Sequence, residues 1–419
     1  MPEYTAPRGT KDVLPEETPK WQYLENMFRD ICKLYGVQEI RTPTFEHTEL
    51  FTRNLGESTD VVSKEMYTFK DRSDRSITLR PEGTAGAIRA YVQHNLGEKL
   101  PVCKVFYIAN LFRYERPQSG RYREHTQMGI EVIGSSDPSI DAEVISLVVH
   151  FYNKIGLNDY TLKLNSIGCN ECRPLYKEAL KNYLSNKVEK MCDSCLNRYE
   201  TNPLRILDCK NPDCKDLIAE SPTLVEYLDD DCKKHFEDVQ KYLNALNIEY
   251  ILDPRLVRGF DYYTKTAFEF VSGTLGAQNA IGGGGRYDNL VQDIGGKPTP
   301  AIGFGLGLER LIMTLDSLNI QLPIDKSISV YIAPLGSPAR EMCVNILKDM
   351  RLAGISADMD YIGKSLKAQM KTADKMGAKL AIIVGDDEVA SNEVIIRDMY
   401  SSSQVKLSVN KIIEYIFKN

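Results

Sequence analysis

The stretch from Leu111 to Glu131 constrains the fold of this 419-residue chain more than any other segment. Its sequence is LFRYERPQSGRYREHTQMGIE. Apolar residues alternate with polar ones at its start, and Pro117 and Gly120 mark a tight turn before the chain returns toward Gly129 and Glu131. Alternation followed by turn residues is typical of two strands joined by a loop. The stretch therefore predicts a β-hairpin.

The same hairpin is unusually rich in charge. Because the guanidinium group is a planar fork that grips phosphate or carboxylate with two hydrogen bonds, such a hairpin suits a polyphosphate ligand. The alternative is a solvated edge hairpin whose charges prevent aggregation. Its charged residues include Arg113, Glu115, Arg116, Arg121, Arg123, Glu124 and Glu131.

Composition limits the class of protein. The chain is 42% apolar and 26% charged, and its length allows two or three domains with cores of their own. No apolar run approaches the ~20 residues that a membrane span needs, and the start at Met1 to Tyr4 lacks a signal segment, so we expect a cytoplasmic protein without a membrane partner. The net charge of −6 means that any nucleic acid must bind to a local basic surface.

Two segments before the hairpin contribute to the prediction. A helix with an apolar face from Trp21 to Tyr35 precedes a strand from Val37 to Phe45, and Pro43 places that strand at a sheet edge or a subunit contact. Later, Glu82, Gly83 and Thr84 stand between a short strand and a helix. They can hold an ammonium group, or they can simply start the helix, with Glu82 in its first turn and Thr84 as its cap.

Seven of the ten cysteines lie between residues 169 and 232. The pairs Cys169/Cys172 and Cys192/Cys195 have the spacing of a tetrathiolate zinc knuckle. However, a helix is predicted from Pro174 to Met191, between the pairs. The alternative is a helical insertion in which reduced cysteines pack as small apolar residues.

Three glycine-containing or charged patches follow. The first runs from Leu256 to Tyr263 and the second is the four-glycine run that begins at Gly282. Consecutive glycines indicate a backbone that closely approaches a ligand or another chain, or else a flexible loop. The third, from Gly303 to Leu311, has alternating glycines before a helix and does not have the spacing of the dinucleotide fingerprint.

Beyond a linker at 322–326, the pattern of strand, helix, strand, helix and strand predicts a separate α/β domain. Four lysines recur there at helical spacing, at Lys364, Lys367, Lys371 and Lys375. Such a stripe is either a solvated helix face or, on this acidic chain, the best candidate for a nucleic-acid surface.

Together these patches resemble class II aminoacyl-tRNA synthetases, and in detail the histidyl-tRNA synthetase family. Residues 21–45 resemble motif 1, 111–131 motif 2 and 303–311 motif 3, while 256–263 and 280–288 resemble peptides of the histidine-specific members. The resemblance implies an α+β fold, in which an antiparallel sheet flanked by helices forms a catalytic domain at 1–325. It also implies a helical insertion at about 169–248, an anticodon-binding domain at 326–419 and a homodimer.

The resemblance further implies a two-step reaction, in which ATP and Mg²⁺ activate histidine before transfer to tRNA(His). Arg113 and Arg258 would act at the α-phosphate, Arg121 and Arg310 at the outer phosphates, and Glu115 near the adenine. Gln118 would meet the tRNA acceptor end. The implied histidine-binding residues are Glu82, Gly83, Thr84, Gln127, Glu131, Arg258, Tyr262 and Tyr263. The cysteines are a departure from the family pattern, and the resemblance does not decide whether the insertion binds zinc.

Two other functions would explain parts of this pattern. One is a catalytically inactive, histidine-sensing regulatory paralogue, which typically lacks the C-terminal domain and some of the arginines. The other is a zinc-organised RNA-binding module, which would leave the arginine hairpin and the 303–311 motif unexplained.

Overall fold

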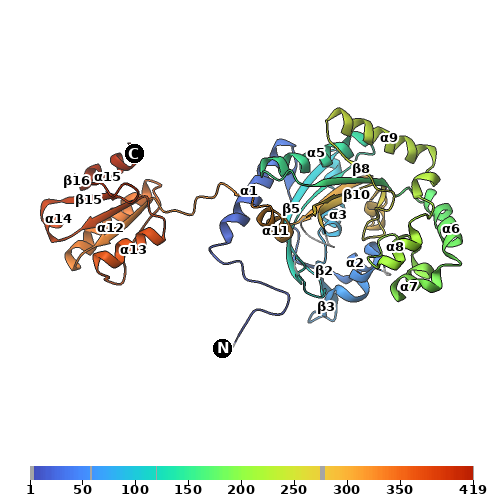
Figure 1. The fold of residues 1–419 in the computed structure, drawn as a ribbon, viewed down its shortest axis with the longest axis horizontal. Coiled ribbons are helices and arrows are strands. Elements are labelled where there is room, and N and C mark those ends of the chain that lie inside the picture. The colour runs from blue at the N-terminus through green and yellow to red at the C-terminus, as the bar shows by residue number, and fades with distance from the viewer. Residues whose placement is uncertain (1–3, 57–58, 119, 274–278, 419) are drawn as a thin grey trace. The chain divides into compact units, whose positions relative to one another are not determined.

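The computed structural model describes residues 4–56, 59–118, 120–273 and 279–418. The chain forms two compact units, Met1–Leu322 and Pro323–Asn419 (Figure 1). Within the described residues, no helix has both the length and the apolar character to cross a bilayer.

The first unit is built on one large, mostly antiparallel sheet (Figure 1). In the part of the chain that the structure describes, neighbouring strands pair antiparallel throughout the centre of the sheet, and only the two end strands join in parallel. This arrangement confirms the predicted fold class. Among the described residues the strand order is β1 (Gln38–Glu39), β5 (Cys103–Phe112), β6 (Glu124–Ile133), β11 (Ala301–Gly307), β10 (Ala280–Arg286), β9 (Thr264–Val271), β7 (Thr161–Ser166) and β8 (Ile251–Leu252).

The predicted hairpin is present and longer than expected. Strands β5 and β6 pair from Cys103 opposite Ile133 to Phe112 opposite Glu124, and the arginine-rich segment forms the connecting loop. Ser119 lies outside the described residues. The hairpin therefore contributes two central strands and one polar loop.

One face of the sheet is apolar and buried. Ile130, Phe304 and Phe268 are register partners across β6, β11, β10 and β9, so their side chains share this face. Phe28 of the covering layer meets Phe106 of β5 edge to face, with ring centroids 5.8 Å apart. The helices whose buried residues join this core are α1 (Thr18–Leu34), α5 (Pro138–Lys154), α9 (Asp230–Ala245) and α11 (Leu308–Ser317).

A smaller sheet and short helices complete the unit. The segment around Pro43 forms two short strands rather than one, since proline has no amide to donate. As predicted, both lie at edges: β1 ends the large sheet and β2 ends the small one. These elements are β2 (Phe45–His47), α2 (Thr48–Leu55), η1 (Val61–Glu65), β3 (Tyr67–Lys70), β4 (Ser76–Leu79), α3 (Thr84–Gln93), α4 (Leu96–Lys99) and α10 (Leu290–Asp293).

The cysteine-rich segment is helical, and its helices α6, α7 and α8 lie together at one side of the first unit (Figure 1). Its apolar residues, such as Tyr176, Leu180 and Ile206, are buried in a hydrophobic core separate from the one on the apolar face of the large sheet. Its elements are α6 (Cys172–Leu184), η2 (Val188–Lys190), α7 (Asp193–Thr201), η3 (Pro203–Ile206), α8 (Pro212–Ile218) and η4 (Leu224–Tyr227).

The second unit has the predicted α/β pattern. Its sheet has the order β13-β12-β14-β15-β16, parallel among the first three strands and antiparallel thereafter. The four predicted stripe lysines are exposed, whereas Gln369 and Ala373 on the same segment are buried. The elements are β12 (Val330–Pro334), α12 (Ser337–Leu352), β13 (Ala357–Met359), α13 (Leu366–Lys375), β14 (Leu380–Val384), α14 (Asp386–Ser391), β15 (Glu393–Asp398), β16 (Gln404–Ser408), η6 (Val409–Lys411) and α15 (Ile412–Lys418).

Candidate functional site

The face of the large sheet opposite the apolar core carries polar side chains above glycines. Glu131 and Gln127 of β6 lie opposite Gly303 and Gly307 of β11, so all four residues address the same face. A Cβ atom on Gly303 would lie 2.0 Å from Glu131 Oε2, and one on Gly305 would lie 2.9 Å from Gln127 Cδ. The alternating glycines therefore make room for two polar side chains of the neighbouring strand. We call this surface the polar face.

The four-glycine run has a similar role. It is the buried strand β10, which contradicts the alternative of a flexible loop. A Cβ on Gly283 would lie 2.6 Å from Arg258 Nη1, and one on Gly285 would lie 3.0 Å from Tyr263 Cδ1. The missing side chains thus allow Arg258 and Tyr263 to lie directly against the sheet.

Glu131 is the most deeply buried acid of the polar face, with 1% of its surface exposed. Thr84 Oγ1 donates to Glu131 Oε1 at 2.8 Å, and the Tyr287 hydroxyl donates to Oε2. Burial raises the pKa of Glu131 to about 8, although these hydrogen bonds act in the opposite direction. Near neutral pH this group can therefore donate a proton as an acid or accept a hydrogen bond as a carboxylate.

The sequence left two roles open for Glu82 and Thr84, a helix start or part of a binding site, and the structure gives one role to each residue. The carboxylate of Glu82 accepts hydrogen bonds from the amides of Thr84 and Ala85, both at 2.7 Å, so it stabilises the start of α3. Thr84 does not cap the helix, because its hydroxyl is directed to Glu131. A Cβ on Gly83 would overlap the ring of Tyr107 at 2.2 Å. The segment is both a helix start and part of the polar face.

Tyr107 and Tyr287 are site residues that sequence reasoning missed. The Tyr107 hydroxyl donates to Gln127 Oε1 at 2.8 Å, and its ring fills the space above Gly129. Tyr107 lies opposite Gly129 in the β5–β6 register, which is the signal that places it on the polar face. For Tyr287 the only signal was its place after the glycine run.

Arg258 lies beside these tyrosines. Its Nη1 donates to Glu269 Oε1 at 3.0 Å, and its guanidinium carbon lies 5.6 Å from the centre of the Tyr263 ring. The rings of Tyr262 and Tyr263 are 4.6 Å apart, and Tyr262 meets Tyr287 edge to face at 5.5 Å. One cation thus lies next to a cluster of three buried tyrosines.

The hairpin loop brings a second group of arginines to the site. Glu115 forms an ion pair with Arg121 Nη1 at 3.0 Å and lies 3.8 Å from Arg113 Nη1. Arg310, from α11, donates through Nε to the carbonyl of Gly120 at 3.0 Å. The structure therefore brings Arg113, Arg121 and Arg310 together, and the phosphate-binding roles given to them stay predictions.

His125 is a further residue near the site, and no short motif in the sequence singled it out. Burial, together with the positive charges of Arg113 and Arg310, lowers its pKa to about 3. The imidazole is therefore neutral at physiological pH and adds no positive charge to the arginine group. Gln118, by contrast, is exposed in the hairpin loop, where its backbone bonds with that of Arg121.

Arg286, between the glycine run and Tyr287, has a structural role. Its side chain is fully buried, and Nε donates to Asp141 Oδ1 of α5 at 2.8 Å while Nη1 donates to Asp288 Oδ1 at 2.9 Å. These bonds tie β10 to α5 and fix the strand that ends next to Tyr287.

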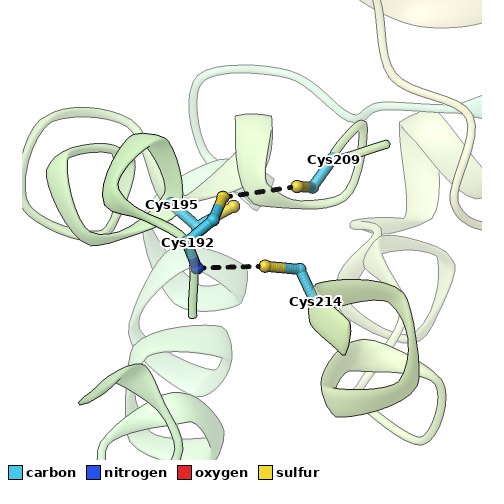
Figure 2. Close-up of side chains that lie close together, drawn as sticks. All are labelled: Cys192, Cys195, Cys209 and Cys214. Atoms are coloured by element: carbon cyan, nitrogen blue, oxygen red, sulfur yellow. Dashed lines mark hydrogen bonds between the residues drawn. The ribbon is translucent and has the colours of Figure 1, made fainter. Parts of the chain in front are cut away.

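The cysteines pair differently from the prediction. The proposed knuckle of Cys169, Cys172, Cys192 and Cys195 is wrong, because α6 separates the two pairs. Cys192 and Cys195 instead meet Cys209 and Cys214, with ligand atoms within 4.8 Å of one another (Figure 2). The other pair meets Asp229 and Cys232. The sequence spacing identified two cysteines of each cluster but wrongly assigned all four to a single site.

Comparison with known proteins shows which family the chain resembles along its length. Residues 9–311 match the family described as histidyl-tRNA synthetase, and residues 329–419 match the anticodon binding domain. The histidine–tRNA ligase of Caldanaerobacter subterraneus subsp. tengcongensis is 49% identical over 414 residues, covering 99% of each chain. That of Moorella thermoacetica is 51% identical over 415 residues, covering 99% of this chain and 98% of the relative. A crystal structure of apo S. aureus histidyl-tRNA synthetase is similar with a TM-score of 0.84 and 38% identity, over 99% of both chains.

Proposed function

The chain belongs to the histidyl-tRNA synthetase family and is a histidine–tRNA ligase, and from this premise we propose which of its residues carry the reaction. Histidine attacks the α-phosphorus of ATP to form histidyl-adenylate and pyrophosphate, and the terminal ribose hydroxyl of tRNA then takes the histidyl group. The observation that carries the assignment is the polar face, where Glu131 and Gln127 lie near Arg258 above strands of glycine. The regulatory alternative has no support, since the chain matches an anticodon binding domain at 329–419.

The histidine side chain would lie between Glu131 and Tyr263. A neutral imidazole has one donor and one acceptor nitrogen, and a site with a partner for each rejects ring isosteres that lack one. Glu131, with its pKa near 8, suits either nitrogen, and the Tyr263 hydroxyl would bind the other. Tyr262 packs against Tyr263 and would set its position.

The α-amino group would be bound at the start of α3. Glu82, Thr84 and Gln127 supply oxygen acceptors there, and Gly83 leaves room for the Tyr107 ring beside Gln127. Both Glu82 oxygens already accept one amide hydrogen bond each, and each retains a further lone pair for an ammonium group.

ATP would bind along the arginines as its Mg²⁺ complex. Arg113 would hold the α-phosphate, Arg121 and Arg310 the outer phosphates, and Glu115 would lie near the adenine. The attacking carboxylate and the α-phosphate are both anionic, so Arg258 would be the second cation where they meet. No protein nucleophile is needed. The carboxylate of Glu269, which accepts from Arg258, is an oxygen ligand of the kind that Mg²⁺ prefers.

The tRNA would contact both units. Gln118, exposed in the hairpin loop, would meet the acceptor end, and the lysine stripe of the second unit would bind the tRNA(His) backbone. Phosphate contacts of this kind are electrostatic and weaken as salt rises.

We predict that the double variant Lys367→Glu/Lys371→Glu raises the KM for tRNA about tenfold or more and lowers the slope of its salt dependence by about two. Histidine-dependent pyrophosphate exchange should not change, because adenylate formation uses only the first unit. The matched control is Lys348→Glu, an exposed lysine on α12 that pairs with Asp349. Normal tRNA charging by the double variant would show that the stripe is only a solvated face.

We also propose a structural zinc in the insertion, bound by Cys192, Cys195, Cys209 and Cys214. The sulfurs of Cys192 and Cys209 are 3.8 Å apart, which equals the separation of about 3.8 Å expected for two thiolates at ~2.3 Å from a tetrahedral ion. The amide of Cys192 donates to the Cys214 sulfur at 3.3 Å. Four thiols without a competing carboxylate are the donor set of closed structural sites.

Two further properties are proposed. The chain would form a homodimer through residues 21–45, where Leu34 and Phe45 are 71% and 55% exposed and would be covered by a second copy. It would act in the cytoplasm, which agrees with ten cysteines that form no disulfide bond.

A further inference from the structure

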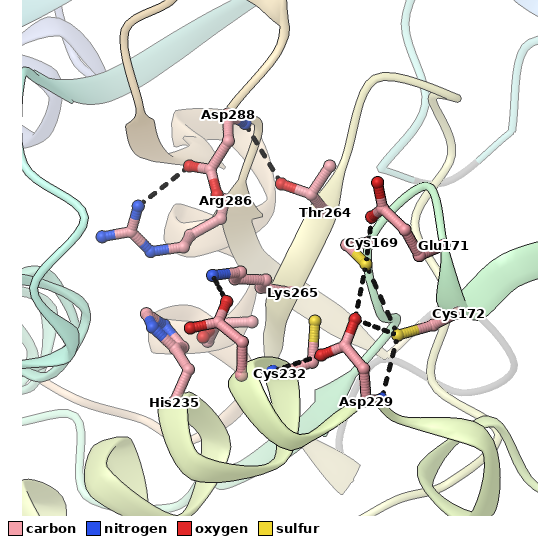
Figure 3. A network of polar contacts seen from close by, with 12 residues as sticks. Cys169, Glu171, Cys172, Asp229, Cys232, His235, Thr264, Lys265, Arg286 and Asp288 are labelled. Carbon is pink, nitrogen blue, oxygen red and sulfur yellow. Dashed lines mark hydrogen bonds and ion pairs between the residues drawn. The ribbon is translucent and has the colours of Figure 1, made fainter.

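The second cysteine cluster lies where the insertion joins the catalytic sheet. Cys169 and Cys172 stand at the turn between β7 and α6, and Cys232 lies in the first turn of α9. Asp229 caps that helix by accepting from the amide of Cys232 at 2.7 Å. Figure 3 shows the three sulfurs and the Asp229 carboxylate turned toward one another.

The distances within this cluster suit a common ion. Cys169 Sγ lies 3.5 Å from Cys172 Sγ and 3.0 Å from Asp229 Oδ2, and Cys172 Sγ lies 3.2 Å from the same oxygen. All four ligand atoms, that of Cys232 included, lie within 4.8 Å of one another. A tetrahedral zinc with sulfur ligands at ~2.3 Å and oxygen at ~2.0–2.2 Å needs only small shifts from this arrangement. The amide of Asp229 also donates to Cys172 Sγ at 3.3 Å, an interaction that stabilises a thiolate.

We propose that Cys169, Cys172, Asp229 and Cys232 bind a second structural zinc ion, independent of the Cys192 site. Three soft sulfurs and one carboxylate favour zinc over the hard cations Mg²⁺ and Ca²⁺. Cys172 and Cys232 are buried, whereas Asp229 is only partly buried, so the ion would lie at the rim of the insertion with a route of entry.

Two cations lie near the cluster. Three thiolates, one carboxylate and one Zn²⁺ leave two negative charges, which these cations offset only in part because Lys265 is already paired with Asp231. Lys265 pairs with Asp231 at 2.6 Å, and Arg173 donates to the carbonyl of Ile167 at 3.2 Å from the first turn of α6. Glu171 is a further acid beside the cluster, since Cys169 Sγ lies 2.8 Å from its Oε2. It is the carboxylate that could replace Cys169 as a ligand.

The position of the ion gives it a structural task. The turn before Cys169 bonds to the start of β9, because Lys265 N donates to Gly168 O at 2.8 Å and Ile167 N donates to Lys265 O at 2.7 Å. Lys265 has φ of +47°, which is strained for a residue with a side chain. It stands two residues after Tyr263. The ion would therefore join β7, α6 and α9 and fix the turn that supports the strand leading from the tyrosines.

The test is the metal content of the full chain, purified with zinc in the growth medium and dialysed against metal-free buffer. Zinc and other metals per chain are measured by atomic emission. We expect two zinc ions in the wild type, one in Cys232→Ser and one in Cys214→Ser. Asp229→Asn distinguishes the two roles of Asp229 as zinc ligand and as helix cap, because asparagine caps helices as well as aspartate does. We expect it to fold normally and to release one zinc to a competing chelator at least about tenfold faster than wild type.

Two control variants should keep both ions: Asp230→Asn, a neighbouring acid outside the cluster, and Cys343→Ser, a buried cysteine of the second unit. If Cys232→Ser does not fold, Asp229→Asn carries the test alone. The second site would be overturned if the wild type holds one zinc ion, Cys214→Ser loses it, and both Cys232→Ser and Asp229→Asn retain it unchanged. One zinc with the opposite behaviour would instead overturn the Cys192 site. A metal other than zinc, or none, would overturn the assignment of zinc.

Discussion

Replacing Arg258 with alanine should slow histidyl-adenylate formation by about 10²–10³-fold or more, because it removes a preorganised cation from the place where two anionic groups meet. Arg258 lies against Gly283, pairs with Glu269 and contacts the Tyr263 ring, so its position is fixed before the substrates bind. Histidine binding should weaken only modestly, since Glu131 and Tyr263 would still hold the ring. Pyrophosphate exchange at saturating histidine measures the loss, and thermal unfolding confirms that the variant is folded.

Two variants make this prediction specific. Arg258→Lys keeps the charge but not the planar fork, so it should recover only part of the rate. Arg53→Ala removes an exposed arginine of α2, paired only with Glu49 among the described residues, and should exchange at the wild-type rate. Near-normal exchange by Arg258→Ala would refute the role given to Arg258.

A single methyl group on Gly303 should damage histidine recognition almost as severely. The added Cβ of Gly303→Ala would lie 2.0 Å from Glu131 Oε2 and 2.9 Å from the carbonyl of Ile130, so the carboxylate has to move. A displacement of about 1 Å in a positioned group costs about 10²-fold. We expect the KM for histidine to rise by at least that factor, whereas the KM for ATP should change little because the arginines are on other elements.

The readout separates a local effect from a damaged sheet. Gly307→Ala is the control for stability, since its Cβ meets no protein atom within 4 Å, and its melting temperature should match the wild type. Gly303→Ala/Glu131→Asp, with a shorter acid, should recover part of the histidine affinity. Equal increases in the KM for histidine and for ATP would show that Gly303→Ala disturbs the sheet as a whole.

The fold was predictable because its signals are local. Alternation and turn residues in 111–131 identified the hairpin, and the C-terminal pattern of strands and helices identified the second unit. Together with the spaced motifs, these signals gave the fold class and the family correctly. The glycines of β11 were a weak signal alone, because they are needed to make room for Glu131, which lies on a neighbouring strand.

The parts that the sequence did not reveal depend on contacts between distant segments. The cysteine spacing joined the wrong pairs, although the helix predicted between them already indicated that they could be held apart. The actual partners of each pair are set by α6, α8 and the start of α9. Tyr107, Tyr287 and His125 belong to no short motif. Only the strand register and the packing of the loop bring them to the polar face. The roles assigned to the site residues remain predictions that the variants above test.

The central claim is that this polar face activates histidine and no other amino acid. The most direct measurement is amino-acid-dependent exchange of labelled pyrophosphate into ATP, with histidine beside the other nineteen amino acids under the same conditions. We predict exchange with histidine alone, because a buried acid and a tyrosine hydroxyl together match the two nitrogens of imidazole. Exchange with another amino acid would contradict the assigned specificity. Histidine binding without any exchange would mean that the chain senses histidine and does not activate it.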